Sequence, residues 1–112
     1  MKAPYRKAYQ HLINRALAQG FTISVDSGGD ELDLKRSSDY AAIVDACEAV
    51  DEARLLIRDA NNQRFAAVLV SGFGLADDET VIDYAGAHAA ATQWLDDWFE
   101  DYQFEFEHGV RT

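Results

Sequence analysis

Residues 53–70, ARLLIRDANNQRFAAVLV, decide the fold because two strand-like runs flank a polar turn. The first run alternates apolar and polar side chains and leads into the turn Ala60-Asn61-Asn62, which predicts a β-hairpin. The second run, residues 65–70, is apolar at every position. Because a strand that is apolar on both faces is typical of a sheet interior, we place this strand in the middle of a sheet.

The residues before this hairpin predict a helix, another hairpin and a second helix. A helix over residues 4–19 starts with proline and stops before glycine, as these residues do at opposite helix ends. Residues 21–34 alternate on both sides of a Ser-Gly-Gly turn, which predicts two strands. Ser37 and Ser38 are N-cap candidates for the second helix. Its apolar stripe consists of Tyr40, Ile43, Val44, Cys47 and Val50.

The residues after the hairpin predict a final helix. Residues 80–83, TVID, have the spacing of a capping box. The helical pattern starts at about Ile82 or Ala87, and we place its end near residues 101–103. Residues 102–108 alternate with period two, so a short strand there is an open alternative.

The expected fold class is therefore α+β, as a single domain over residues 1–112. The predicted order is helix-hairpin-helix-hairpin-helix, with a four-stranded, mainly antiparallel sheet and packed helices. A chain of 112 residues with 48% hydrophobic and 27% charged residues fits one globular domain.

Cysteine content and hydropathy predict a cytoplasmic protein without membrane contact. Cys47 is the single cysteine, so no intrachain disulfide forms and a reducing compartment is expected. No apolar run approaches the about 18 residues of a membrane span, and the first residues lack the apolar region of a signal peptide.

The net charge of −10 is distributed unevenly. Residues 1–20 contain four basic residues and no acid, whereas residues 77–112 contain ten acids and one base. So acidic a surface repels nucleic acid and attracts basic partners, and we expect no direct nucleic-acid binding. If the first helix packs beside the last one, it neutralises part of this charge. If the two helices lie apart, the molecule has a usable negative end.

The most acidic segment is residues 94–107, WLDDWFEDYQFEFE, which contains six carboxylates, six aromatic residues and no base. On a helical wheel most of the aromatic residues share an arc of about 140°, opposite most of the carboxylates. Like charges one turn apart and acids near a helix C-terminus together cost about 1 to 3 kcal/mol. Carboxylates one turn apart are separated by about 5 to 6 Å, comparable with phosphates along a nucleic acid. The acids are therefore either a solvated face or a binding face.

The candidate partner-binding residues are acidic and form two groups. The group on the final helix consists of Asp96, Asp97, Glu100, Asp101 and Glu105. The group before that helix consists of Asp77, Asp78 and Glu79. These three also fit the ordinary preference for acids at a helix N-terminus.

No catalytic residue, metal site or cofactor is predicted, and we expect a protein that is not an enzyme. The histidines lack zinc-ligand spacing with one another and with Cys47, which falls on an apolar stripe. Residues 72–74, Gly-Phe-Gly, lack the remaining residues of a phosphate loop. The acids around the Ser-Gly-Gly turn lack calcium-loop spacing.

The strings ISVDSGGDELDLKRSSDYAAIVDACEAVDEARLLIRDANNQRFAAVLV and GLADDETVIDY contain a polar turn, a Lys-Arg-Ser-Ser-Asp helix start, an Ile-Arg-Asp-Ala strand end and a late acidic segment. In these features residues 20–84 resemble small uncharacterised proteins encoded by bacteriophages and prophages. The resemblance implies a phage context and supplies no catalytic residues. In size and charge, though in no alignable motif, the chain is similar to phage inhibitors of host defence, including DNA-mimicking restriction inhibitors and acidic anti-CRISPR proteins.

The expected function is therefore that of an acidic, phage-encoded inhibitor in the host cytoplasm, which binds the basic nucleic-acid-binding surface of a host defence protein. One alternative is an accessory or scaffold protein that self-associates, for example as a homodimer, through exposed aromatics such as Phe73 and Phe104. A less favoured alternative is a metal-dependent hydrolase, which would use Asp77, Asp78, Glu79 and Asp83.

Overall fold

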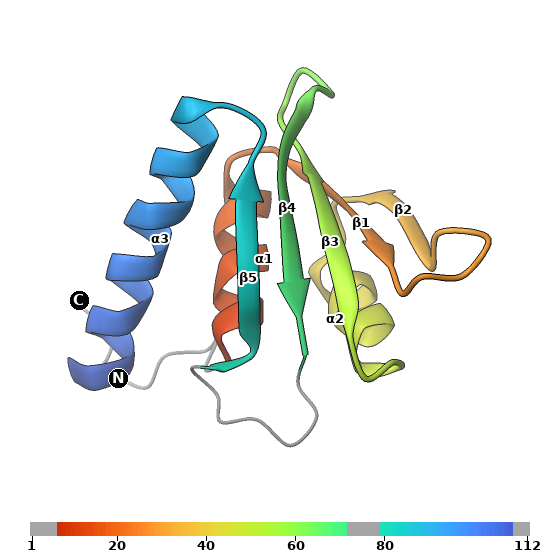
Figure 1. Cartoon of the computed structure of the whole chain (residues 1–112), viewed down its shortest axis with the longest axis horizontal. Helices are drawn as coiled ribbons and strands as arrows, with labels where there is room; N and C mark the ends of the chain where they lie inside the picture. The colour runs from red at the N-terminus through yellow and green to blue at the C-terminus, as the bar shows by residue number, and fades with distance from the viewer. Residues whose placement is uncertain (1–6, 72–78, 109–112) are drawn as a thin grey trace.

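The computed structural model describes residues 7–71 and 79–108, and its described side chains end at residue 105. The elements are α1 (Ala8–Ala18), β1 (Thr22–Asp26), β2 (Leu34–Ser37), α2 (Tyr40–Glu48), β3 (Ala53–Arg58), β4 (Arg64–Val70), β5 (Val81–Gly86) and α3 (Ala89–His108). The five strands form one antiparallel sheet in the order β2-β1-β3-β4-β5 (Figure 1). The chain is thus a single α+β domain.

The predicted four-stranded sheet with helix-hairpin-helix-hairpin-helix order is wrong, because the order is α-β-β-α-β-β-β-α. Residues 81–86, expected near the start of the last helix, form the fifth strand instead. They pair with the free edge of β4 from Val70↔Val81 to Ala66↔Gly86. The capping-box spacing is a local signal, and pairing of Val81 and residues 83–86 with the apolar strand β4 outweighs it.

Two predicted helix boundaries are also wrong. The N-cap of α2 is Asp39, whose carboxylate accepts hydrogen bonds from the backbone N–H groups of Ala41 and Ala42 at 3.1 and 3.5 Å. α3 continues to His108, past the expected end near residues 101–103, and the alternative strand over residues 102–108 does not form. The helix continues because its buried stripe continues: Tyr102 is 2% exposed and stacks on Trp98.

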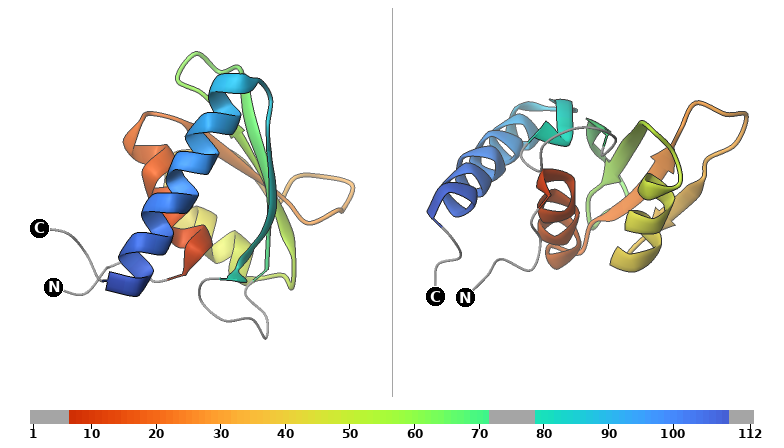
Figure 2. Two further views of the ribbon diagram at one scale, coloured as in Figure 1. Left: turned by 60° about the vertical axis from the view of Figure 1, so that its left-hand side comes forward. Right: turned by 90° about the horizontal axis from the view of Figure 1, so that it is seen from below.

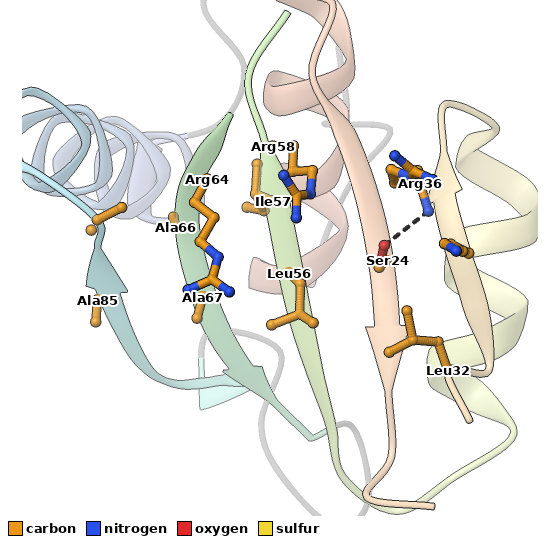
Figure 3. A pocket seen from close by; sticks show the side chains of 13 residues that line it. Ser24, Leu32, Arg36, Leu56, Ile57, Arg58, Arg64, Ala66, Ala67 and Ala85 are labelled. Carbon is orange, nitrogen blue, oxygen red and sulfur yellow. Dashed lines mark hydrogen bonds between the residues drawn. The ribbon is translucent and has the colours of Figure 1, made fainter. Parts of the chain in front are cut away.

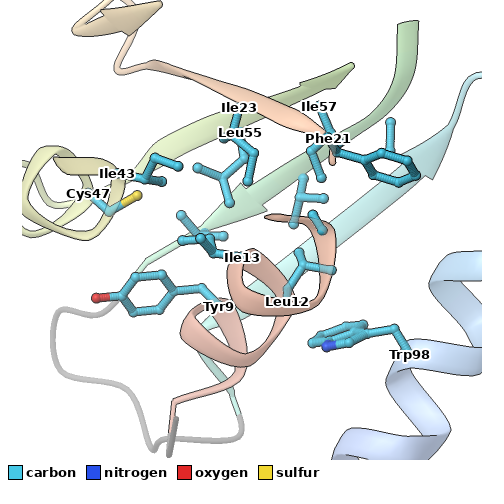
Figure 4. Close-up of a cluster of buried hydrophobic side chains, with 14 of the residues drawn as sticks. Tyr9, Leu12, Ile13, Phe21, Ile23, Ile43, Cys47, Leu55, Ile57 and Trp98 are labelled. Carbon is cyan, nitrogen blue, oxygen red and sulfur yellow. The ribbon is translucent and has the colours of Figure 1, made fainter. Parts of the chain in front are cut away.

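The three helices lie on one face of the sheet (Figure 2). The core forms between them, and Figure 4 shows α1 at its centre, with α2 and α3 on either side. Burying an aliphatic core side chain contributes about 1.5 to 3 kcal/mol. The largest fully buried side chains are Trp98, Tyr102, Leu12, Ile13, Ile23, Ile43, Leu55, Ile57 and Leu95.

No helix of the described residues covers the other face of the sheet, and every second strand residue points to that face (Figure 2). In β3, Ala53, Leu55 and Ile57 are buried, and the residues between them point to the opposite face. No helix in the described ranges combines the length and the apolar character that a bilayer crossing requires.

The junction between β5 and α3 is tight at Gly86. A Cβ atom on Gly86 would lie 2.4 Å from the backbone nitrogen of Thr92 and 2.6 Å from its Oγ1. His88 caps the N-terminus of α3, because its Nδ1 accepts a hydrogen bond from the N–H of Ala91 at 3.2 Å. The absence of a side chain at Gly86 therefore allows α3 to fold back against the sheet.

Candidate functional site

α3 places the predicted carboxylates on its outer side. Ala91, Leu95, Trp98 and Tyr102 form the buried stripe of this helix. Of the predicted acids, Glu105 is half-buried, and the exposed ones are Asp96, Asp97, Glu100 and Asp101. The expected division of the helix into an aromatic inner side and an acidic outer side is confirmed for Leu95, Trp98 and Tyr102, whereas Phe99, expected on the inner side, is 37% exposed.

α1 lies beside α3 and engages two of the five predicted acids. Arg15 Nη1 of α1 is 2.7 Å from Asp101 Oδ2. His11 contacts Glu105 through Nε2, and its Nδ1 accepts a 3.0 Å hydrogen bond from Trp98 Nε1. Because Nδ1 is an acceptor, the ring proton is on Nε2 and is donated to Glu105. Of the two expected arrangements, the one in which the first helix neutralises part of the acidic charge is therefore present.

The other three predicted acids of α3 have no cationic partner in the described ranges. Asp96 accepts a hydrogen bond from the Tyr84 hydroxyl at 3.2 Å, and Asp97 accepts one from Gln93 at 2.9 Å. Burial, and then the hydrogen bond and charge of Asp96, raise the pKa of Tyr84, so the tyrosine remains the donor. Phe99, which is 37% exposed, lies on the same helix. We call Asp96, Asp97, Phe99 and Glu100 the acidic α3 face.

The second predicted group of acids is only partly described. Asp77 and Asp78 lie outside the described residues, and Glu79 is exposed just before β5. Asp83, invoked for a hydrolase, is exposed on β5. The described part of the chain contains no group of three or more His, Cys, Asp or Glu residues able to hold a metal ion.

The residues considered for self-association and for thiol chemistry occupy different places. Phe104 is 40% exposed on α3, and Phe73 lies outside the described residues. Cys47 is buried in the core, and desolvation followed by the nearby Glu48 charge raises the pKa of its thiol to about 12. This thiol is therefore protonated at neutral pH and unsuited to nucleophilic chemistry.

A second surface, which the sequence did not predict, lies on the helix-free face of the sheet. It is a groove of about 620 Å³ (Figure 3). Its floor is formed by a row of four residues that lie side by side across β1, β3, β4 and β5, each paired in register with the next. The row consists of Ser24, Leu56, Ala67 and Ala85. Because three of these four side chains are small, the sheet surface is hollowed here.

Basic residues surround this floor. Among the described residues, Lys35, Arg36, Arg58 and Arg64 line the groove, and no acidic residue does. These four are more than half of the seven lysines and arginines in the described ranges, although the whole chain has a net charge of −10. We call this hollow the basic groove.

A β-bulge in β2 brings Lys35 and Arg36 into the groove together. Ile23 pairs with Ser37 and Val25 pairs with Leu34, so β2 has one extra residue opposite β1. Neighbouring residues of a regular strand point to opposite faces, and a bulge removes this restriction. Arg36 adopts φ 43°, a left-handed conformation, and its N–H donates to the buried Ser24 Oγ at 2.8 Å.

Arg58 and Arg64 face each other across β3 and β4. They are register partners, and a second bulge separates this pair from the pair Ile57↔Ala66. Arg58 Nη1 donates to the Asn62 carbonyl at 2.9 Å. The side chain of Arg64 has no hydrogen bond or ion pair with a described residue. Figure 3 shows Arg64 extended along β4 beside Ala67.

The sequence contained a partial signal for the basic groove. In ARLLIR, Arg54, Leu56 and Arg58 alternate with core residues, so both arginines belong to the outer side of β3. The register that sets Arg64 opposite Arg58 depends on pairing between strands, and so does the bulge at Lys35 and Arg36. These two features were missed for that reason.

Comparisons with protein-family models, with curated proteins and with solved structures give no match to this chain.

Proposed function

We propose that this chain is a non-catalytic inhibitor that covers the basic, nucleic-acid-binding surface of a host defence protein with its acidic α3 face. The supporting observation is that Asp96, Asp97 and Glu100 are exposed and form no ion pair within the described part of the chain. Like charges one turn apart destabilise a helix. An external cationic partner would compensate for this cost, whereas α1 compensates only for Asp101 and Glu105.

The geometry of α3 suits this role. Leu95, Trp98 and Tyr102 anchor the helix in the core, so its outer side is held rigidly before a partner arrives. Asp96 and Glu100 are one turn apart, about 5 to 6 Å along the axis, which resembles the spacing of backbone phosphates. Phe99 adds an apolar contact among the charges, the arrangement in which a binding hot spot is surrounded by a polar rim.

The resemblance of residues 20–84 to phage proteins directs the search for the partner to bacterial defence proteins. Such proteins bind nucleic acid through Lys and Arg side chains, which an acidic helix can occupy. Complementary charge also accelerates encounter, and this effect weakens as salt rises.

The experiment compares tagged wild-type protein with two variants of equal net charge in pull-downs from a bacterial host lysate. The test variant is Asp96→Asn/Asp97→Asn/Glu100→Gln. The control variant, Glu31→Gln/Asp45→Asn/Glu52→Gln, removes three other exposed acids whose side chains have no partner in the described ranges. We expect a nucleic-acid-binding protein to be retained by the wild type and the control, eluted by salt, and lost by the test variant.

The captured protein is then purified, and its binding to its nucleic acid is measured with and without the chain. Inhibition by the wild type and the control, and not by the test variant, supports the proposal. Equal capture by all three proteins would contradict it, as would a captured protein whose nucleic-acid binding is unchanged.

A further inference from the structure

We propose that the basic groove is a binding site for a small organic phosphate, with the phosphate between Arg58 and Arg64 and the organic part on the floor of Leu56, Ala67 and Ala85. This site lies on the opposite side of the sheet from the helices and is independent of the acidic α3 face.

The charges identify the ligand as an anion. Four cationic side chains line the groove without an acidic one, in a protein with a net charge of −10. Arg58 and Arg64 are directly opposite each other, an arrangement that destabilises a sheet unless an anion lies between the two charges. A guanidinium group matches the geometry of a phosphate, with which it forms two parallel hydrogen bonds.

The backbone of β2 is shaped for the same site. The bulge directs Lys35 and Arg36 to one face, and Arg36 retains a left-handed conformation that is unfavourable for a residue with a side chain. Ser24 stabilises this conformation by accepting the Arg36 N–H. Local strain of this kind is concentrated at binding and catalytic sites. Strands two apart in a sheet are separated by about 10 Å, so β2 and β3 present cations at two sides of the groove.

The size and the floor of the groove favour a small organic molecule over a polymer. A volume of about 620 Å³ falls in the range of small-molecule sites. The apolar floor would be unused by inorganic phosphate alone. Single-stranded nucleic acid is bound on aromatic platforms, and no aromatic side chain lines this groove. The acidic molecule as a whole also repels a long polyanion.

The test is a titration of the ¹⁵N-labelled full chain with phenyl phosphate, the simplest probe that carries both a phosphate and a flat apolar group. We expect saturable shifts of the amide signals of Ser24, Leu56, Ala67 and Ala85. Phenol lacks the phosphate and inorganic phosphate lacks the apolar group. Each is therefore expected to bind at least about tenfold more weakly.

Two matched variants test the assignment of the phosphate. Arg64→Gln removes a groove cation, and we expect it to weaken phenyl phosphate binding about tenfold. Arg54→Gln removes an exposed arginine from the same face of β3, outside the groove lining, and binding is expected to be unchanged. The amide spectra of both variants also show whether the fold is preserved.

Each contrary outcome overturns the proposal in a distinct way. If the groove signals do not shift, there is no such site. If inorganic phosphate binds as tightly as phenyl phosphate, the groove is a simple anion site. If the two variants weaken binding equally, the attraction comes from overall charge. If the groove signals shift as the protein alone is concentrated, the occupant is the acidic α3 face of a second copy.

Discussion

The acidic α3 face and the basic groove carry opposite charges and are built in different ways. The acidic residues are within five positions of one another on a single helix. The basic residues come from β2, β3 and β4 and converge through strand pairing and two bulges. One surface is therefore determined by helical periodicity alone, whereas the other exists only once the sheet has formed.

The two surfaces also differ in how the protein compensates for like charges. On α3, Arg15 and His11 engage Asp101 and Glu105, so Asp96, Asp97 and Glu100 are the described acids of this helix without an ion pair. In the groove, Arg64 has no partner among the described residues, and Arg58 donates to a backbone carbonyl only. Charge without an ionic partner among the described residues is thus present on both surfaces.

The largest expected effect is at Gly86, which lines the groove and also contacts α3. A methyl group there would clash with the backbone of Thr92, so Gly86→Ala should lower the free energy of unfolding by about 1 to 3 kcal/mol. Urea denaturation measures this change. Gly29→Ala is the control, because its nearest contact would be 3.9 Å away. Equal stabilities of the two variants would show that the two surfaces do not share this junction.

A smaller effect is expected for the ion pair that joins α1 to α3. A double-mutant cycle with Arg15→Met and Asp101→Asn should give a coupling energy of about 0.2 to 1 kcal/mol, which decreases as salt rises. The matched cycle pairs Arg15→Met with Asp97→Asn, because Asp97 accepts a hydrogen bond from Gln93 and forms no ion pair with a described residue. Coupling of similar size in both cycles would mean that α1 acts on the whole acidic surface through its general field.

The smallest expected change in the free energy of unfolding concerns two arginines on the helix-free face. Arg64 is opposite Arg58, so Arg64→Gln should raise the free energy of unfolding by about 0.2 to 1 kcal/mol. Arg54 is opposite Asp26, so Arg54→Gln should lower it by a similar amount. Thermal unfolding at low salt measures both changes. A loss of stability in Arg64→Gln would indicate that Arg64 serves the fold, and it would remove one argument for a ligand site.

The sequence predicted local elements well and long-range pairing poorly. The hairpin of residues 53–70 forms where alternation places it, with strands Ala53–Arg58 and Arg64–Val70. The helical wheel correctly assigned Leu95, Trp98 and Tyr102 to the buried side of α3. In each of these cases the pattern reports which side of one element meets the core.

β5 shows the limit of such patterns. Residues 81–86 contain both a helix-start spacing and β-branched residues, and only the free edge of β4 decides between the two. The basic groove has the same origin, because Arg58 and Arg64 meet through register, and Lys35 and Arg36 meet through a bulge. The net charge of the chain does not reveal such a cluster, because it sums the charges of the basic groove and of all the acidic surfaces.

Alternation along β3 and β4 determines which residues of this protein tolerate substitution. Along β3 and β4 most core residues alternate with residues of the groove, and Ile57 and Ala66 belong to both sets. A change at a groove residue other than these two therefore leaves the core in place. Substitutions at Leu56, Arg58 or Ala67 can therefore accumulate without loss of the scaffold. The outer surface of the sheet can thus change its chemistry while the packing beneath it stays the same.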